Sequence, residues 1–323
     1  MTETRQEFTV PAALSGRRLD AALAALCPDY SRTSIKTWIG EGRVRVNDTP
    51  ANRPRLQVHT GDRVELAAAL VLDTQTEPQA LRFSLAYEDA ALLVVDKPAG
   101  LVVHPGAGNR DRTLVNGLLH RFPELGALPR AGIIHRLDKD TSGLLIVARN
   151  PATYQALTRQ MAARTIHRRY AAIVHGLPPL QGTVDAAVGR DRAQRTRMRV
   201  RHDGREAVTH YRVVQRFAAH TLLDLALETG RTHQIRVHMQ HIGHPLVGDP
   251  TYARGRIASS QLPDTLNAAF VRLGRQALHA KSLQFEHPSI GKMLDVRSPL
   301  PADFRRVLRA LETDLAETAI DAG

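Results

Sequence analysis

Cysteine is almost absent from this chain of 323 residues, with Cys27 as its one example. A single thiol cannot form an internal disulfide or a zinc site built from several cysteines. Because Cys27 follows the apolar series Leu19, Leu23 and Leu26, we expect it to be buried and to have no catalytic role.

Long apolar segments are also missing. No stretch approaches the roughly 18 apolar residues that a membrane-spanning helix requires, and the start, MTETRQEFTV, lacks the apolar core of a signal peptide. We therefore expect a cytoplasmic protein with no membrane partner. With 43% hydrophobic residues, the chain can bury a core for one large and one small domain, which is compatible with a monomer.

Acidic residues are fewer than basic ones. Asp and Glu total 32 against 44 for Lys and Arg, giving a net charge of +12. Such an excess favours a polyanionic partner, because each neutralised phosphate releases condensed counterions. RNA, DNA and an anionic membrane all meet this description, and the membrane fits least well.

The amino-terminal region has the pattern of a small helical and stranded unit. Ser31 is placed to cap a helix whose inner face carries Ile35, Trp38 and Ile39. Gly42 then supplies the left-handed conformation that ends a helix before an alternating strand begins.

Four cations are left on the outside of this unit: Arg32, Lys36, Arg43 and Arg45. A solvated face is the usual role of such a cluster, but the excess of basic side chains also suits a surface that follows RNA phosphates. The segment resembles an S4 RNA-binding domain, which we assign to residues 16–75.

The rest of the chain predicts an α+β domain. Residues 67–82 have no sustained periodicity and are expected to form a linker, with the large domain at 83–315 and a flexible tail at 316–323. Five strand-length apolar runs are bounded by turn residues: LLVVDKP (92–98), GLLIVAR (143–149), YAAIVHG (170–176), YRVVQRF (211–217) and LLDLALE (222–228). Helical patterns are fewer, at 151–164 and 301–319. We expect a large, mixed and mainly antiparallel sheet.

The densest polar segment runs directly into one of these strands. It reads GIIHRLDKDTSGLLIVAR, from Gly132 to Arg149, and contains His135, Arg136, Asp138, Lys139, Asp140, Thr141 and Ser142. An ordinary turn could use the same residues, since Asp, Thr and Ser often bind nearby backbone amides. A catalytic loop is the alternative.

Two further clusters, 96–108 and 228–250, are also rich in Gly, His and cations. In the second, Arg231, His233 and Arg236 could converge on an anion, either an RNA phosphate or a carboxylate of the protein. A catalytic aspartate must stay ionised in a site that excludes water, so it needs an arginine partner. Arg236 is our candidate for that partner.

Three motifs in this domain resemble the signatures of the RluA-type pseudouridine synthases: KPAGLVVH, HRLDKDTSG and GRTHQIRVH, in that order. The resemblance implies a pseudouridine synthase fold with no cofactor and no metal. It implies that Asp138 is the catalytic aspartate, that Arg236 pairs with it, and that Arg136 fills the gap left in the RNA by the flipped base. Tyr170 matches the tyrosine that stacks on the extruded uracil, although an ordinary core role is an alternative for a strand tyrosine.

The reaction that this resemblance implies is the isomerisation of uridine in RNA. The members that the chain resembles most act on large-subunit (23S) ribosomal RNA, which implies a ribosomal stem-loop, helix 69, as substrate. Another ribosomal or transfer RNA site is an alternative, and so is a non-catalytic RNA-binding or ribosome-assembly protein. The sequence leaves open whether Asp138 attacks C1' or removes the C2' proton.

An arginine-rich segment lies between the third and fourth of the five predicted strands. Arg195, Arg197, Arg199 and Arg201 alternate with other residues, so a strand would place all four on one face. We expect that face to bind RNA, with a plain solvated face as the alternative.

A metal site is a weaker alternative for the region after Arg236. His238, His241 and His244 are spaced by three and Asp249 could complete the set, but glycine and proline interrupt the helix. We therefore expect no metal and favour a structural or RNA-contacting role for these histidines.

Overall fold

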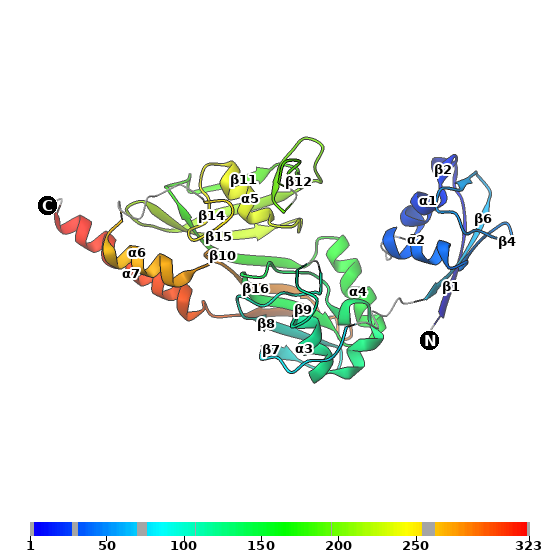
Figure 1. The fold of residues 1–323 in the computed structure, drawn as a ribbon, viewed down its shortest axis with the longest axis horizontal. Helices are drawn as coiled ribbons and strands as arrows, with labels where there is room; N and C mark the ends of the chain where they lie inside the picture. Colours follow the sequence, from blue (N-terminus) through cyan, green and yellow to red (C-terminus); the bar gives the residue numbers. More distant parts are fainter. Residues whose placement is uncertain are drawn as a thin grey trace. The chain divides into compact units, whose positions relative to one another are not determined.

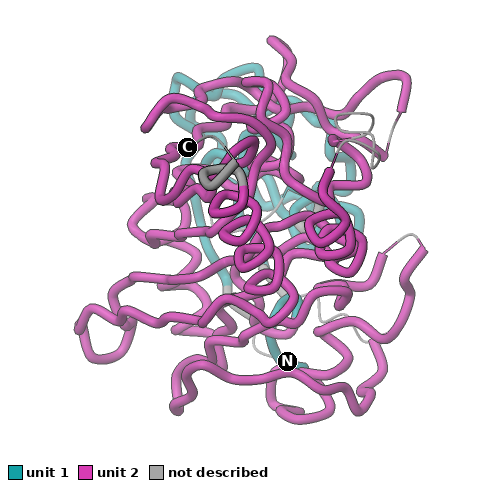
Figure 2. The backbone as a smooth tube through the Cα atoms, turned by 90° about the vertical axis from the view of Figure 1, so that its left-hand side faces the viewer, with its two compact units in different colours: residues 1–75, 126–130 teal, residues 76–125, 131–323 magenta. Residues whose placement is uncertain are grey.

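The chain forms two compact units in the computed structural model, which describes residues 3–27, 32–69, 76–106, 108–194, 196–253 and 262–321. One unit contains residues 1–75 with the short segment 126–130, and the other contains 76–125 and 131–323 (Figure 2). Two residues that the sequence singled out, Ser31 and Arg195, lie outside the described ranges.

The amino-terminal unit combines two helices with short strands. Its four-stranded sheet has the order β1 (Glu3–Thr9), β6 (Arg63–Ala69), β3 (Val44–Val46) and β4 (Thr49–Pro50), and a separate pair joins β2 (Arg17–Arg18) to β5 (Gln57–Val58). The helices are η1 (Ala12–Leu14), α1 (Leu19–Leu26) and α2 (Arg32–Gly40). Ile35, Trp38, Ile39 and Cys27 are buried in one apolar core, and Gly42 has φ +73°, so these expectations are confirmed.

A nine-stranded sheet dominates the larger unit (Figure 1). Its order is β11 (Gln181–Asp185), β14 (Val208–Arg216), β15 (His220–Leu227), β10 (His167–His175), β16 (Leu278–Glu286), β9 (Ser142–Ala148), β8 (Leu92–Lys97) and β7 (Ser84–Glu88), with β17 (Met293–Arg297) also paired to β16. All pairs are antiparallel except β9 with β16. The predicted α+β fold with a mixed, mainly antiparallel sheet is confirmed.

Helices and a small hairpin surround this sheet. They are α3 (Leu114–Arg121), α4 (Pro151–Ala162), α5 (Gln234–His241), α6 (Asp264–Leu273), α7 (Ala302–Asp321) and the hairpin of β12 (Val188–Arg190) with β13 (Met198–Val200). The short helices η2 (Pro123–Ala127) and η3 (Pro129–Gly132) each include residues of both units. Figure 1 shows α3 and α4 at the end of the sheet formed by β7, β8 and β9, and α5 with the hairpin at the opposite end. Among the described helices, none is long and apolar enough to cross a membrane.

Two apolar clusters support the two ends of the sheet. One packs α4 against β8, β9, β16 and β17, and includes Ile146, Leu157 and Phe285. The other packs α6 and α7 against β10, and includes Ile173 and Phe304. The strand residues in each cluster belong to the alternating or continuous apolar runs that predicted these strands.

The expected linker and tail differ from the structure. Within 67–82, residues 67–69 extend β6 and residues 70–75 lie outside the described ranges, whereas 76–82 run along α3. Backbone N–H of Gln79 donates to the Asn116 carbonyl at 3.0 Å, and Asn116 Nδ2 donates to the Glu77 carbonyl at 2.8 Å. These bonds give a polar segment an ordered path that its composition did not indicate. Residues 316–321 continue α7 as helix.

The parallel pair of β9 and β16 is short and tightly spaced. Ser142 pairs with His279 and Gly143 pairs with Ala280. Gly143 has φ +108°, and a Cβ at this position would lie 2.2 Å from the Ala280 carbonyl oxygen. Only glycine permits this approach. It fixes the point where the polar loop before β9 enters the sheet.

Candidate active site

The loop that carries Asp138 is held by hydrogen bonds to its backbone. The Thr141 N–H donates to the Asp138 carbonyl at 3.1 Å, which closes a turn. Arg275 Nη1 donates to the Asp140 carbonyl at 3.1 Å, and Gln276 Nε2 donates to Thr141 Oγ1 at 3.1 Å. The short polar residues therefore form a turn, as the sequence suggested, and that turn presents the Asp138 side chain with 16% of its surface exposed.

Lys97 lies fully buried beneath this loop. Its Nζ donates to the carbonyls of Pro98, Leu101 and Lys139 at 2.8 to 2.9 Å, which uses all three donors of an ammonium group. Burial lowers the pKa of Lys97 to about 7, while the charges of two loop aspartates, led by Asp140, oppose that shift. The amine joins the end of β8 to the loop that carries Asp138.

Arg236 is the cation next to Asp138. Its Nη1 donates to Asp138 Oδ2 at 3.2 Å, and its Nε and Nη2 donate to the two oxygens of Asp249 at 2.7 and 3.0 Å. The Tyr252 ring lies 5.0 Å from the guanidinium carbon. Burial alone would lower the pKa of Arg236, but hydrogen bonds and charges from Asp249 and Asp138 raise it above its ordinary value. The guanidinium is therefore charged and fixed in orientation.

Tyr170 is buried in β10, two strands from the start of β9. It pairs with Ala280 of β16, which is the residue that also pairs with Gly143. Burial raises the pKa of the Tyr170 hydroxyl, and the charge of Asp138 adds to that rise. The raised pKa keeps the hydroxyl protonated, and the strand pairing places Tyr170 two strands from β9, which follows the Asp138 loop.

His233 and Arg136 lie at the edge of the same site. His233 has a left-handed backbone, φ 56°, at the start of α5, and its Nδ1 hydrogen-bonds with the Tyr252 hydroxyl at 2.9 Å. Burial lowers the pKa of His233, opposed by the charge of Asp138 and reinforced by nearby cations including Arg136. Arg136 is exposed and is therefore available to an external partner.

Arg231 does not join this group. Its Nε donates to the Glu206 carbonyl at 3.0 Å, and its backbone N–H donates to Gln234 Oε1 at 2.9 Å. Burial and the charge of Arg205 lower the pKa of Arg231. Of the three residues expected to converge on an anion, Arg236 alone contacts a carboxylate of the loop.

The basic residues of the amino-terminal unit are exposed but engaged with other protein groups. Arg32 Nη2 and Lys36 Nζ lie 2.9 and 3.8 Å from Oδ2 of the buried Asp20. Although burial would raise the pKa of Asp20, hydrogen bonds from Arg18 and Arg32 hold it below its usual value. These cations stabilise a buried carboxylate and still present about half of each side chain to solvent.

The two other cations of that surface also have protein partners. Arg43 Nε lies 2.8 Å from Glu41 Oε2, and Arg45 Nε donates to the Asp48 carbonyl at 3.0 Å. Exposed contacts of this kind contribute little to stability and can be exchanged for a phosphate. An RNA-binding role for these residues stays a prediction.

The strand β13 covers Met198–Val200, so Arg199 is the one described arginine of the expected face that lies in a strand, and Arg195 lies outside the described ranges. After Val200 the chain turns, with the Gly204 N–H donating to the Arg201 carbonyl at 3.0 Å, and Arg201 binds Asp203 with its Nε and Nη2 at 2.6 Å. Arg197 lies over the Tyr252 ring at 5.3 Å, and Arg199 is exposed. Arg197 and Arg199 remain beside one opening, as described below.

The histidines after Arg236 have separate partners. His238 Nε2 donates to the Ala186 carbonyl at 2.9 Å, and His244 Nδ1 donates to the His175 carbonyl at 2.9 Å. Asp249 is occupied by Arg236. Within the described ranges no three metal-binding side chains gather in one place. The regular spacing of these histidines in the sequence did not bring their side chains together around one ion.

Two positioning residues were missed by the sequence reasoning. Asp249 was considered only as a metal ligand, and Tyr252 was not considered at all. Both lie in GDPTY (248–252), which begins ten residues after the end of the third motif, and Asp249 Oδ1 also accepts from the backbone N–H groups of Thr251 and Tyr252 at 2.9 and 3.0 Å. An aspartate followed by a turn and an aromatic residue is a signal that could have pointed to a partner for Arg236.

The chain is similar to known proteins in its family profiles and along its whole sequence. The family profile described as RNA pseudouridylate synthase matches residues 91–241, and that of the S4 domain matches 17–64. The ribosomal large subunit pseudouridine synthase D of Xanthomonas campestris is 48% identical over 314 residues, covering 97% of this chain and 95% of that protein. The protein of the same name from Pseudomonas aeruginosa is 48% identical over 310 residues, covering 94% and 95%.

A solved structure shows the same fold in the larger unit. Human RNA pseudouridylate synthase domain containing 4 superposes with a TM-score of 0.56 at 26% identity, covering 71% of this chain and 93% of that one. Human RNA pseudouridylate synthase domain containing 1 superposes with a TM-score of 0.53 at 26% identity, covering 73% of this chain and 98% of that one.

Proposed function

The chain belongs to the RNA pseudouridine synthase family and carries an S4 domain, and from this premise we propose that it converts uridines of large-subunit ribosomal RNA to pseudouridine. The target follows from the name shared by its relatives. We assign the helix 69 stem-loop as the substrate. The reaction needs no cofactor and takes place in the cytoplasm, with the protein as a monomer.

One observation carries the proposal. Asp138 lies in a mostly buried site, and the immobilised guanidinium of Arg236 donates a hydrogen bond to its carboxylate at 3.2 Å. An anionic side chain held in this way is ready to act on a sugar without reorganisation. Asp249 neutralises and orients the same guanidinium, so Arg236 does not neutralise Asp138 fully. These features support Asp138 as the nucleophile or base.

The chemistry balances without another reactant. The bond between N1 of uracil and C1' of ribose breaks, the base rotates, C5 bonds to C1', and C5 loses its proton while N1 gains one. Asp138 would either attack C1' and be displaced later, or remove the C2' proton and return it. An ionised carboxylate at this position serves both routes, so the proposal covers both.

Base flipping gives roles to two other side chains. An enzyme that acts on a base in structured RNA must extrude it and hold its face. We assign the buried ring of Tyr170 as the surface against which uracil packs, and the exposed Arg136 as the group that enters the helix in its place. The burial of Tyr170 in the sheet and the exposed position of Arg136, two residues before Asp138 in the same loop, support these roles.

The experiment combines cells and purified protein. Pseudouridine mapping of ribosomal RNA from cells lacking this chain should show lost modification confined to large-subunit RNA, in helix 69. Purified wild-type protein should restore it on that stem-loop, and Asp138→Asn should bind the stem-loop normally but turn over at least about 1,000-fold more slowly. Asp140→Asn, in the same loop, is the matched control and should stay active.

A non-catalytic RNA-binding or ribosome-assembly protein is the alternative from another class. It predicts that cells lacking the chain keep every pseudouridine and that Asp138→Asn complements them fully. Loss of modification at transfer RNA sites instead would keep the reaction and reject the target.

A further inference from the structure

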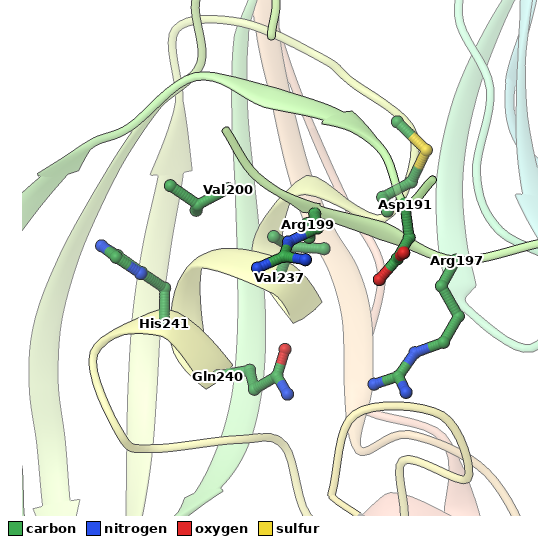
Figure 3. A pocket seen from close by; sticks show the side chains of 8 residues that line it. Asp191, Arg197, Arg199, Val200, Val237, Gln240 and His241 are labelled. Carbon is green, nitrogen blue, oxygen red and sulfur yellow. The ribbon is translucent and has the colours of Figure 1, made fainter. Parts of the chain in front are cut away.

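A pocket of about 260 Å³ lies between the β12–β13 hairpin and α5 (Figure 3). Its lining comes from both elements: Asp191, Arg197, Met198, Arg199, Val200, Val237, Gln240 and His241. This volume is slightly below the usual size of small-molecule sites and suits one small group, such as a single base or phosphate.

The lining combines the kinds of group that a nucleotide needs. Arg197 and Arg199 bring two positive charges to the opening, Val200 and Val237 form a small apolar part of a mainly polar lining, and the Gln240 amide can both donate and accept. Guanidinium groups bind phosphate oxygens, and an amide can bind a base edge.

The one acid in the lining is already used by the protein. Asp191 Oδ1 accepts from the backbone N–H groups of Ala193 and Gln194 at 2.8 and 3.3 Å, and these bonds hold the pKa of Asp191 below its usual value. Its carboxylate shapes the turn of the hairpin. The net charge offered to a ligand in the pocket is positive.

A chain of contacts through Tyr252 and Arg236 connects the pocket to Asp138. Arg197 and Arg236 lie over the same Tyr252 ring, at 5.3 and 5.0 Å from its centre. The backbone N–H of Met198 donates to the Tyr252 hydroxyl at 2.9 Å. On α5, Gln240 follows Arg236 by one helical turn and so shares its side of the helix. An RNA strand that reaches Asp138 is therefore close to this opening.

We propose that the pocket is a second RNA subsite, which takes a nucleotide of the substrate other than the reacting uridine. This inference rests on the proposed function and adds a place where the enzyme reads the surroundings of its target. The two arginines bind the phosphate of that nucleotide, and the Gln240 amide contacts its base. Binding there holds the hairpin against Tyr252, which in turn contacts Arg236.

Three variants test the subsite on a stem-loop RNA. Arg199→Gln removes a cation, Gln240→Trp fills the opening without changing charge, and Arg272→Gln, on the exposed side of α6, is the charge-matched control. We expect the first two to raise both Kd and KM about tenfold with kcat within twofold of wild type. Arg199→Gln should also reduce the slope of log K against log salt by about 0.7 to 0.9, whereas Gln240→Trp should not.

The outcomes separate the subsite from general charge attraction. If Gln240→Trp binds the RNA as wild type does, the pocket is empty in the complex and the proposal is wrong, whatever Arg199→Gln does. Equal losses for Arg272→Gln and Arg199→Gln would also overturn it. Binding is measured on RNA whether or not turnover occurs, so failure of the proposed reaction would be seen separately, as absent pseudouridine in wild type.

Crosslinking provides a test that needs no substitution. A stem-loop carrying 4-thiouridine at one position at a time is irradiated with the wild-type protein, and the attached peptides are identified. We expect one position outside the reacting uridine to mark residues 197–200 or 240–241. Crosslinks at other surfaces from every position would contradict the subsite.

Discussion

Arg236 gives two of its hydrogen bonds to Asp249, at 2.7 and 3.0 Å, and only one to Asp138, at 3.2 Å. The stronger partner of the arginine is therefore not the residue that we assign to the reaction. Asp249 is itself held by two backbone N–H groups. Asp249 therefore sets the orientation of the Arg236 guanidinium, and part of the Asp138 surface is left open to substrate.

Replacing Asp249 should damage turnover more than binding. Asp249→Asn keeps the shape but removes the charge that orients Arg236, so the guanidinium can turn and pair fully with Asp138. We expect kcat on a stem-loop RNA to fall about 10- to 100-fold, with KM within threefold, because the RNA-contacting surface is unchanged. Asp295→Asn, which breaks an exposed ion pair with Arg297, is the control and should behave as wild type. A fall in binding alone would count against a positioning role.

Arg136 should matter for base flipping rather than for initial association. It is exposed beside the site, and no other group that we assign replaces the flipped base. We expect Arg136→Ala to bind stem-loop RNA within threefold of wild type while a 2-aminopurine next to the target loses most of its fluorescence increase. Arg136→Lys tests whether charge suffices. Weaker association with an unchanged fluorescence signal would reverse this assignment.

Lys97 should make stability depend on pH. Burial lowers its pKa to about 7 in the folded chain, against about 10.5 when unfolded, so between these values the unfolded state binds more protons. Stability should therefore rise as pH increases from 7 to 9.5. We expect a contribution of about 1 to 3 kcal/mol, since the three carbonyls favour the ammonium form and offset part of the burial.

Denaturant unfolding at several pH values measures this effect by comparison with Lys97→Met. The variant should lack the rise, whereas Lys292→Met, at an exposed lysine, should keep it. Identical pH profiles for wild type and Lys97→Met would show that the amine does not change its protonation on folding.

Activity should survive exhaustive treatment with EDTA. The prediction follows from the histidines after Arg236, because His238 and His244 each bind a backbone carbonyl and Asp249 binds Arg236. Turnover on stem-loop RNA before and after dialysis against the chelator gives the answer. Loss of activity that zinc restores would return the histidine cluster to consideration.

Much of the fold could be predicted because its signals are local. The runs at 92–98 and 143–149 are continuous and β-branched, and they form β8 and β9, two interior strands near one edge of the sheet. Burial of Ile35, Trp38 and Ile39 followed from helical spacing in the same way. What the residues alone did not give was the parallel pairing of β9 with β16, since these strands are more than 130 residues apart in sequence.

The site was predicted unevenly for the same reason. Asp138 and Arg236 stood in recognisable motifs, but the role of Asp249 depends on a hydrogen bond formed only after α5 and the following turn are in place. The period of two at residues 195–201 suggested a strand face, but the chain turns after Val200, where the Arg201 carbonyl accepts from the Gly204 N–H and the Arg201 side chain binds Asp203. Short-range alternation could not reveal that competing contact.

The junction of β9 with β16 has a consequence for how the enzyme becomes active. Asp138 and Lys97 come from the side of the sheet that includes β8 and β9, whereas Tyr170 and Arg236 come from the other side, and each side has its own apolar cluster. A partly folded chain with one side ordered would show only part of the native circular dichroism signal and no isomerase activity. The rate at which catalysis recovers during refolding would thus report when β9 and β16 pair at Gly143, where a single added methyl group would meet the Ala280 carbonyl.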